Sequence, residues 1–148
     1  KCFDKLIEWD PKYAGGWNSK GIILRRLGKP EEAIKCYDKA IEADPKYKLA
    51  WNNKGIILDR SGKLEESIKC FDKATELDPK YKEAWGNKGN ALSDLGKHEE
   101  AIKCFDKVIE LDPKDPDAWN DKGLALQKLG RDDEARECFA RQNKINHA

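Results

Sequence analysis

The five cysteines are the residues whose chemistry stands out first, because each lies in a copy of one short phrase. KCFDK at residues 1–5 returns as KCYDK at 35–39, as KCFDK at 69–73 and 103–107, and as ECFAR at 137–141. Thiolates of this kind could bind a metal or form redox pairs. Successive cysteines lie 34 residues apart, at Cys2, Cys36, Cys70, Cys104 and Cys138.

This spacing argues against a metal site. Two cysteines that bind one zinc ion are usually separated by about two to four residues, and no pair here is that close. The two histidines, His98 and His147, do not lie near any pair of cysteines. A small apolar residue that recurs with a repeated unit explains the thiols better. We therefore expect no metal site and no cofactor.

The sequence also lacks the patterns of an enzyme. Catalysis needs unlike groups placed together once, whereas almost every candidate here recurs every 34 residues. The chain contains no phosphate-binding lysine loop and no GxGxxG, HExxH or GxSxG motif. We therefore expect no catalytic residues and no enzymatic activity.

The overall composition narrows the classes of partner. The chain has 148 residues, with 29 basic and 28 acidic side chains and a net charge of +1. A balance near zero gives no electrostatic reason to expect a nucleic-acid or membrane partner, and no apolar run is long enough to cross a bilayer. Methionine is absent, so we expect the chain to be a piece of a longer protein.

A 34-residue unit is written four times in full. Aligning the recurring Trp and Gly residues gives repeats at 14–47, 48–81, 82–115 and 116–148, while residues 1–13 match only the end of a repeat. Such a period is the signature of a solenoid. The positions that set the phase are Trp17, Trp51, Trp85 and Trp119, then Gly21, Gly55, Gly89 and Gly123, and then Gly28, Gly62, Gly96 and Gly130.

Each repeat is predicted to form two helices. Apolar residues recur at helical spacing in both halves, Gly62 supplies a stop for the first helix, and the proline of Asp78–Pro79 ends the second. No segment shows the alternation of a strand, so the fold class is all-α. In the second repeat the predicted buried positions are Trp51, Gly55, Leu58 and Ser61, then Ser67, Ile68, Phe71, Ala74 and Leu77.

These residues resemble the tetratricopeptide repeat (TPR) family. The second repeat carries the family pattern at Trp51, Gly55, Ser67, Phe71, Ala74 and Pro79, and the match covers the whole chain. The resemblance implies one TPR domain, an α-solenoid of helix-turn-helix repeats that forms a right-handed superhelix, with 1–13 as a partial repeat and a polar last helix. The chain departs from the family at Lys20, Lys54, Lys88 and Lys122, where leucine is common.

The resemblance also bears on the cysteines. Equivalent positions on stacked helices lie about 10 Å apart, whereas a disulfide needs Cα atoms within about 7 Å. We therefore expect five unpaired thiols, which suit a reducing, cytoplasmic location.

In TPR arrays one face of each first helix lines a concave groove that holds peptide segments of partner proteins. Taking each Trp as the centre of the buried stripe, the opposite face follows from the helical period of 100° per residue. The resemblance makes this face the expected peptide-binding groove. It comprises Asn18, Ile22, Arg25, Arg26, Asn52, Asn53, Ile56, Arg60, Glu83, Asn87, Asn90, Asp94, Asp117, Asn120, Asp121 and Leu124.

Six of the eight asparagines lie on this face, although Asn is a poor helix former. Asn53 and Asn87 match an asparagine ladder that some TPR grooves use to hold a ligand backbone, and Ser19 and Asp121 interrupt it. The other explanation is that these are merely solvated small polar residues. In the carboxylate clamp of chaperone-tail TPR domains only Asn53 would fit, so we do not expect that ligand.

Charge changes along the expected groove. Arg25, Arg26 and Arg60 give the first two repeats basic character, whereas Glu83, Asp94, Asp117 and Asp121 make the last two acidic. Because complementary charge sets orientation, a bound segment should be acidic toward the first pair of repeats and basic toward the second. We expect both arginines of the first repeat, Arg25 and Arg26, to point into solvent.

The sequence therefore predicts a scaffold that binds a peptide or helix of another protein. The alternative is a structural spacer or self-association element with no groove ligand. Self-association through residues 1–13 is expected because that segment presents an apolar helix face without its own first helix, formed by Phe3, Leu6, Ile7 and Trp9.

Overall fold

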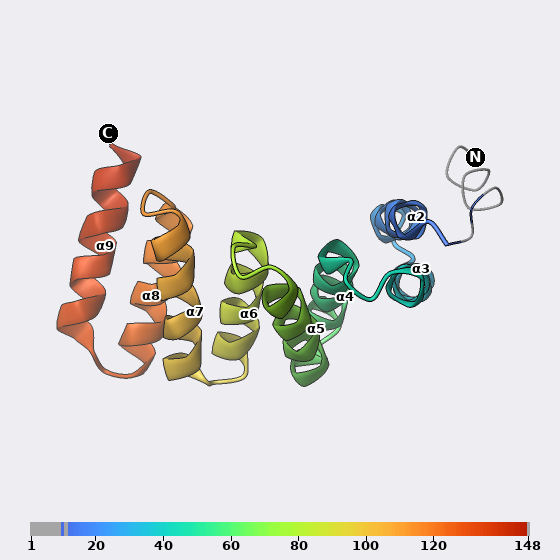
Figure 1. The fold of residues 1–148 in the computed structure, drawn as a ribbon. Coiled ribbons are helices and arrows are strands. Elements are labelled where there is room, and N and C mark those ends of the chain that lie inside the picture. Colours follow the sequence, from blue (N-terminus) through green and yellow to red (C-terminus); the bar gives the residue numbers. More distant parts are fainter. Residues whose placement is uncertain (1–9, 11, 148) are drawn as a thin grey trace. The chain divides into compact units, whose positions relative to one another are not determined.

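The computed structural model describes residue 10 and residues 12–147. Over that part of the chain the secondary structure is helical, with short turns and no strand (Figure 1). The all-α fold of helical repeats is therefore confirmed. The helices are α2 (Ala14–Arg26), α3 (Pro30–Ala43), α4 (Lys48–Arg60), α5 (Leu64–Leu77), α6 (Lys82–Asp94), α7 (His98–Leu111), α8 (Pro116–Lys128) and α9 (Asp132–Asn146).

The helices belong to two compact units. The N-terminal unit, Lys1–Asp78, contains α2 to α5, and the C-terminal unit, Pro79–Ala148, contains α6 to α9. Within the N-terminal unit α2 packs on α3 and α4 packs on α5, while α3 and α2 both contact α4. The C-terminal unit repeats this scheme with α6, α7, α8 and α9. Each unit is thus two stacked helical hairpins.

A glycine facing an aromatic ring closes each hairpin. A Cβ atom on Gly89 would lie 2.5 Å from Cε1 of Phe105, a distance that real side chains do not reach. Phe105 is 2% exposed, so its ring has no room to withdraw. The glycine is therefore needed for the two helices to approach. The same contact recurs between Gly21 and Tyr37, Gly55 and Phe71, and Gly123 and Phe139.

A second glycine ends the first helix of each hairpin. Gly62 has φ of 74°, a left-handed conformation that costs glycine nothing. Its N–H donates to Asp59 O, and the N–H of Lys63 donates to Leu58 O, both at 2.9 Å. This is the Schellman pattern, which satisfies carbonyls at the helix end. The predicted stop is confirmed, and the same conformation occurs at Gly28, Gly96 and Gly130.

The Asp-Pro turn joins one hairpin to the next. Asp44 ends α3, and its carboxylate accepts the N–H of Lys46 at 2.9 Å. The indole of Trp51, in the following helix, then donates to the carbonyl of Pro45 at 3.0 Å. The bond recurs from Trp85 to Pro79 and from Trp119 to Pro113. The recurring Trp and the recurring Asp-Pro pair therefore contact each other in the structure, through the bond from the indole N–H to the proline carbonyl.

The buried face of the second helices differs slightly from the prediction. In α5, Ser67, Phe71 and Ala74 are buried as expected, but Leu77 is 37% exposed and Ile68 is only half-buried. Ser61, at the end of α4, is exposed. Cys70 and Thr75 are buried instead, because the buried stripe of α5 is rotated toward positions 67, 70, 71, 74 and 75.

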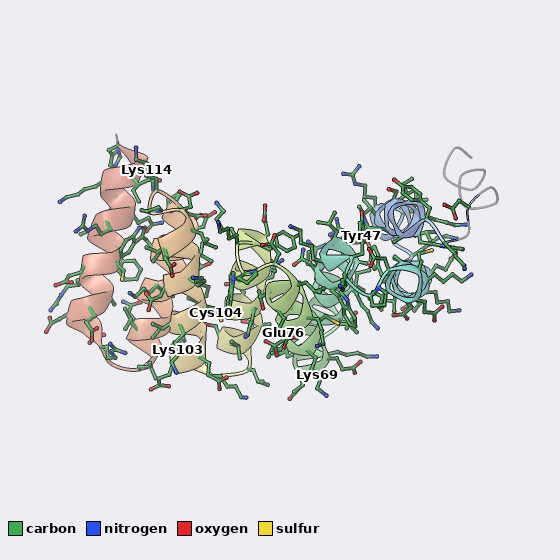
Figure 2. The ribbon with its side chains drawn as sticks, viewed as in Figure 1. Tyr47, Lys69, Glu76, Lys103, Cys104 and Lys114 are labelled. Carbon is green, nitrogen blue, oxygen red and sulfur yellow. The ribbon has the colours of Figure 1, made fainter. Side chains whose placement is uncertain are left out.

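The four described cysteines lie on these buried stripes. Figure 2 labels Cys104 and its neighbour Lys103 on α7: the thiol is buried, while the lysine is exposed. Cys36, Cys70 and Cys138 are buried in the same way. Burial raises the pKa of the Cys70 thiol to about 11, so this group stays protonated and unreactive near neutral pH.

Two alanine substitutions in α6 should change stability in opposite directions. Gly89→Ala introduces the clash with Phe105, and overpacking of this kind costs about 1–3 kcal/mol. Gly86→Ala, one turn earlier, places its Cβ no nearer than 4.0 Å from Val108 Cγ2, so it should gain about 0.5–1 kcal/mol from the lower entropy cost of alanine. Urea unfolding of both variants measures the pair. A stable Gly89→Ala protein would contradict the packing described here.

A thiol titration tests the state of the cysteines. Under denaturing, non-reducing conditions a thiol reagent should count five groups, one for each cysteine. In the native protein at pH 8 the buried thiols should react far more slowly, because the reactive species is the thiolate. Fewer than four groups in the denatured protein would show that disulfides form.

Candidate functional site

The predicted first-helix residues of the C-terminal unit gather around one pocket. It has a volume of about 200 Å³ and lies between α6, α7 and α8. Its inner wall includes Phe105 and Val108 of α7, which are buried. Five residues expected in the groove line it, namely Glu83, Asn87, Asn90, Asp117 and Asp121.

The remaining predicted positions of this unit lie beside the pocket on the same helices. Leu124 of α8 is 47% exposed. Asp94 is exposed at the end of α6. Asn120 is half-buried and donates its amide N–H to Asp121 Oδ1 at 3.2 Å.

In the N-terminal unit two predicted contact residues are buried instead. Asn18 is 5% exposed and Asn52 is 4% exposed, so the expectation that they face a ligand is wrong. The position directly after the Trp lies about 100° around the helix from it. For Asn18 this direction leads to the seam where α2 packs on α4, and the side chain fills that seam.

Asn53 is the partner of Asn18 across this seam. Its Nδ2 donates to Asn18 Oδ1 at 2.9 Å. The amide proposed to hold a ligand backbone therefore already joins two repeats. Asn53 remains half-buried, so only its other donor and its oxygen are available to a ligand.

Two apolar residues that were expected to face a groove ligand from the N-terminal unit are less exposed than predicted. Ile22 is partly buried against the cluster of Ala33, Tyr37 and Ile57, and Ile56 is half-buried. Arg26 and Arg60 are exposed as expected.

Arg25 is half-buried with its Nε out of contact with solvent, so the expectation that it points into solvent is wrong. The positive charge of Arg25 lies close enough to the Tyr37 hydroxyl to affect its pKa. Burial raises the pKa of that phenol, and the nearby guanidinium partly opposes the rise.

Two of the lysines that replace the family's leucine, Lys54 and Lys122, form ion pairs between hairpins. Lys54 Nζ contacts Asp38 Oδ1 at 2.6 Å, and Lys122 Nζ contacts Asp106 Oδ1 at the same distance. Each aspartate directly follows the aromatic residue of the preceding second helix. The sequence could have predicted this pairing, because the lysine and the aspartate recur with the same 34-residue period.

Lys82 neutralises one side of the pocket. Its Nζ contacts Asp112 Oδ2 at 2.8 Å and Asp115 Oδ2 at 2.9 Å, and the first of these bonds is the main cause of the lowered pKa of Asp112. Asp115 Oδ1 also caps α8 by accepting the N–H groups of Asp117 and Ala118. Sequence reasoning missed Lys82, Asp115 and the α7 wall because none lies on the predicted face.

Asp121 lies in a less favourable environment. Burial raises the pKa of its carboxyl, the hydrogen bond from Asn120 opposes that rise, and the negative charges of Asp117 and Asp115 add to it. The charged form of Asp121 is therefore disfavoured by the fold itself.

Metal ligands do not gather in the described part of the chain, where no three His, Cys, Asp or Glu residues are placed to share an ion. None of the described helices is both long and apolar enough to cross a bilayer. The self-association residues Phe3, Leu6, Ile7 and Trp9 lie outside the described residues.

The Asn18–Asn53 bond predicts a measurable coupling between the two side chains. Asn53→Ala leaves the buried oxygen of Asn18 without this donor, which should cost about 1–3 kcal/mol. In the double variant the second substitution should cost less, because the pair is already broken. A double-mutant cycle by urea unfolding should give a coupling of about 0.5–1.5 kcal/mol; strictly additive effects would mean that the bond contributes nothing.

Asp121→Asn should stabilise the protein in a pH-dependent way. A carboxyl whose folded pKa is raised above 3.8 contributes stability that is fully present below pH 3.8 and is lost as the pH rises through the folded value. The variant should therefore have the higher free energy of unfolding at pH 7 and match the wild type near pH 3. Glu137→Gln, at an exposed position inside α9 and beyond its first turn, is the control; a less stable Asp121→Asn protein at pH 7 would contradict this account of Asp121.

Comparisons with known proteins agree with this architecture. Models of the tetratricopeptide repeat match residues 14–47, 49–81, 70–103 and 116–146, and a TPR repeat model matches 89–130. No curated protein sequence matched the chain.

Several solved structures share the fold. A crystal structure of MamA is 23% identical, with 98% of this chain and 85% of that chain covered and a TM-score of 0.91. PilF of Pseudomonas aeruginosa is 22% identical over 97% and 65%, with a TM-score of 0.87. The first TPR of Spaghetti (RPAP3), bound to the HSP90 peptide SRMEEVD, is 31% identical over 82% and 96%, with a TM-score of 0.78.

Repeats of this kind generally serve as non-enzymatic scaffolds for protein–protein interaction. The repeated hairpins, their glycine and tryptophan contacts and the matches along the sequence lead to one conclusion: this chain belongs to the tetratricopeptide repeat family.

Proposed function

We propose that this chain is an interaction scaffold that binds an extended peptide or a helix of a partner protein on the faces of its first helices. The observation that carries the proposal is the pocket of the C-terminal unit, around which five expected contact residues gather from two first helices. Leu124, which is exposed on α8, would add one apolar contact for a partner that lies on these helices.

The two units offer different chemistry to a partner. The first helices of the N-terminal unit present the exposed guanidinium groups of Arg26 and Arg60. Those of the C-terminal unit present carboxylates, chiefly Glu83, Asp94 and Asp117. Opposite charge steers encounter and excludes wrong partners. The N-terminal unit should therefore favour an acidic segment and the C-terminal unit a basic one.

The relative that was solved with a peptide supports this class of ligand. The RPAP3 domain holds the segment SRMEEVD, which carries three acidic side chains and one arginine. An acidic segment of that kind does not suit the carboxylates of the C-terminal unit. We therefore propose that the C-terminal unit also binds a peptide segment, but one that is basic rather than acidic.

Selected peptides and two matched pairs of variants test the proposal. Peptides from a random seven-residue display library, selected on the wild-type protein, are measured by calorimetry. Asp117→Asn should weaken basic peptides by about two- to fivefold, the range of an exposed ion pair, whereas Asp132→Asn should not. Arg26→Gln should do the same for acidic peptides, with the exposed Lys69→Gln of α5 as its control (Figure 2).

Arg25 is left unchanged in this test, because its half-buried side chain would mix effects on folding with effects on binding. Selection of no peptide, or equal affinities across each matched pair, would remove the first-helix faces from the mechanism and leave the structural spacer as the explanation.

A further inference from the structure

The C-terminal pocket exists because one repeat lacks a side chain that the others have. The residue after the Trp is asparagine at positions 18, 52 and 120, but it is Gly86 in the third repeat. In the N-terminal unit the corresponding Asn18 is buried and fills the seam between the two first helices. At Gly86 the nearest atom to an added Cβ is Val108 Cγ2 at 4.0 Å. The space that asparagine would occupy is therefore open.

The walls of this Gly86 pocket are apolar at the base and anionic at the rim. Phe105, Val108 and Ala118 are at most 5% exposed and form the base. Four carboxylates, one ammonium group and the amides of Asn87 and Asn90 line the remainder, together with Gly86. The ammonium of Lys82 and the carboxylate of Asp115 are bonded to each other, which leaves Glu83, Asp117 and Asp121 as the charges that face a ligand.

Asp121 faces the position where the side chain is missing, and it is an aspartate where the N-terminal unit has an asparagine. It occupies the position of Asn53, whose amide reaches Asn18 across the seam of the N-terminal unit. In the C-terminal unit the opposite position is Gly86, which has no side chain, and the Asp121 carboxylate accepts a hydrogen bond from the adjacent Asn120 at 3.2 Å. Burial disfavours its charge and raises its pKa, so a cation placed in the pocket would relieve a cost that the fold now carries.

We propose that the Gly86 pocket holds one lysine or arginine side chain of the partner segment, with the aliphatic stem over Phe105 and Val108 and the cation between Glu83, Asp117 and Asp121. Long basic side chains combine an apolar stem with a charged tip, and this pocket offers the matching order of surfaces. The inference rests on the proposed function, since it names the residue type that the C-terminal unit selects.

The test uses four defined peptides and the intact chain. The probes are acetylated, amidated peptides Ser-Ala-Leu-X-Leu-Ala-Ser in which X is lysine, arginine, norleucine or glutamate. In titrations followed by ¹H–¹⁵N NMR, the lysine and arginine peptides should shift the amide signals of Gly86 and Asp121. The norleucine peptide keeps the stem without the charge, and it should bind about two- to fivefold more weakly, the loss expected for one ion pair.

The decisive variant is Gly86→Asn, which restores the residue of the other repeats. It should abolish the shifts caused by the lysine peptide while raising the urea midpoint, because it fills the pocket and removes a helical glycine. Asp121→Asn should weaken the same peptide by about two- to fivefold, and the exposed Asp132→Asn should not change it. Equal binding of the lysine and norleucine peptides, or unchanged binding to Gly86→Asn, would overturn the proposal.

These outcomes separate the inference from the proposed function. If peptides selected on the wild type bind Gly86→Asn with unchanged affinity, the first-helix faces bind a partner but the pocket does not select its basic residue. If neither the selected peptides nor the four probes bind the wild type, both proposals fail together.

Discussion

Each hairpin depends on the close approach of two helices at a single glycine. The ring that fills this approach, Phe105 in the third repeat, is almost fully buried, and no other residue type leaves room for it on the facing helix. The position of the ring fixes which side of the second helix is buried. That side carries the cysteines, so their 34-residue period follows from packing rather than from thiol chemistry.

Much of this fold could be predicted from the sequence because the signals repeat in phase. Gly62 and the Asp-Pro pairs mark helix ends by local backbone chemistry, and the structure places helix ends there. The burial of Asn18 and Arg25 could not be predicted from the helical period alone. A helical wheel gives the direction of a side chain but not how near the neighbouring helix lies, and α4 lies close enough to α2 to cover Asn18.

The candidate site also combines features that the sequence predicts with features that it does not. The face that carries Glu83, Asp117 and Asp121 was predictable from the Trp register, and these residues do line one pocket. The pocket itself forms because Gly86 has no side chain to fill it. Its base is made by Phe105 and Val108 of α7, which the helical period predicts to be core residues. The comparison of one repeat with the next carries that information, because only the third repeat departs from asparagine.

The bonds from the indoles of Trp51, Trp85 and Trp119 to proline carbonyls each span only six residues. Contacts this close in sequence cost little chain entropy to close, so such a turn can form before the rest of the unit is in place. Each of these three indoles also lies at the junction between its own repeat and the preceding Asp-Pro turn. In a variant that keeps only one of these three tryptophans, the fluorescence of that indole should therefore report the opening of its own junction as the array unfolds.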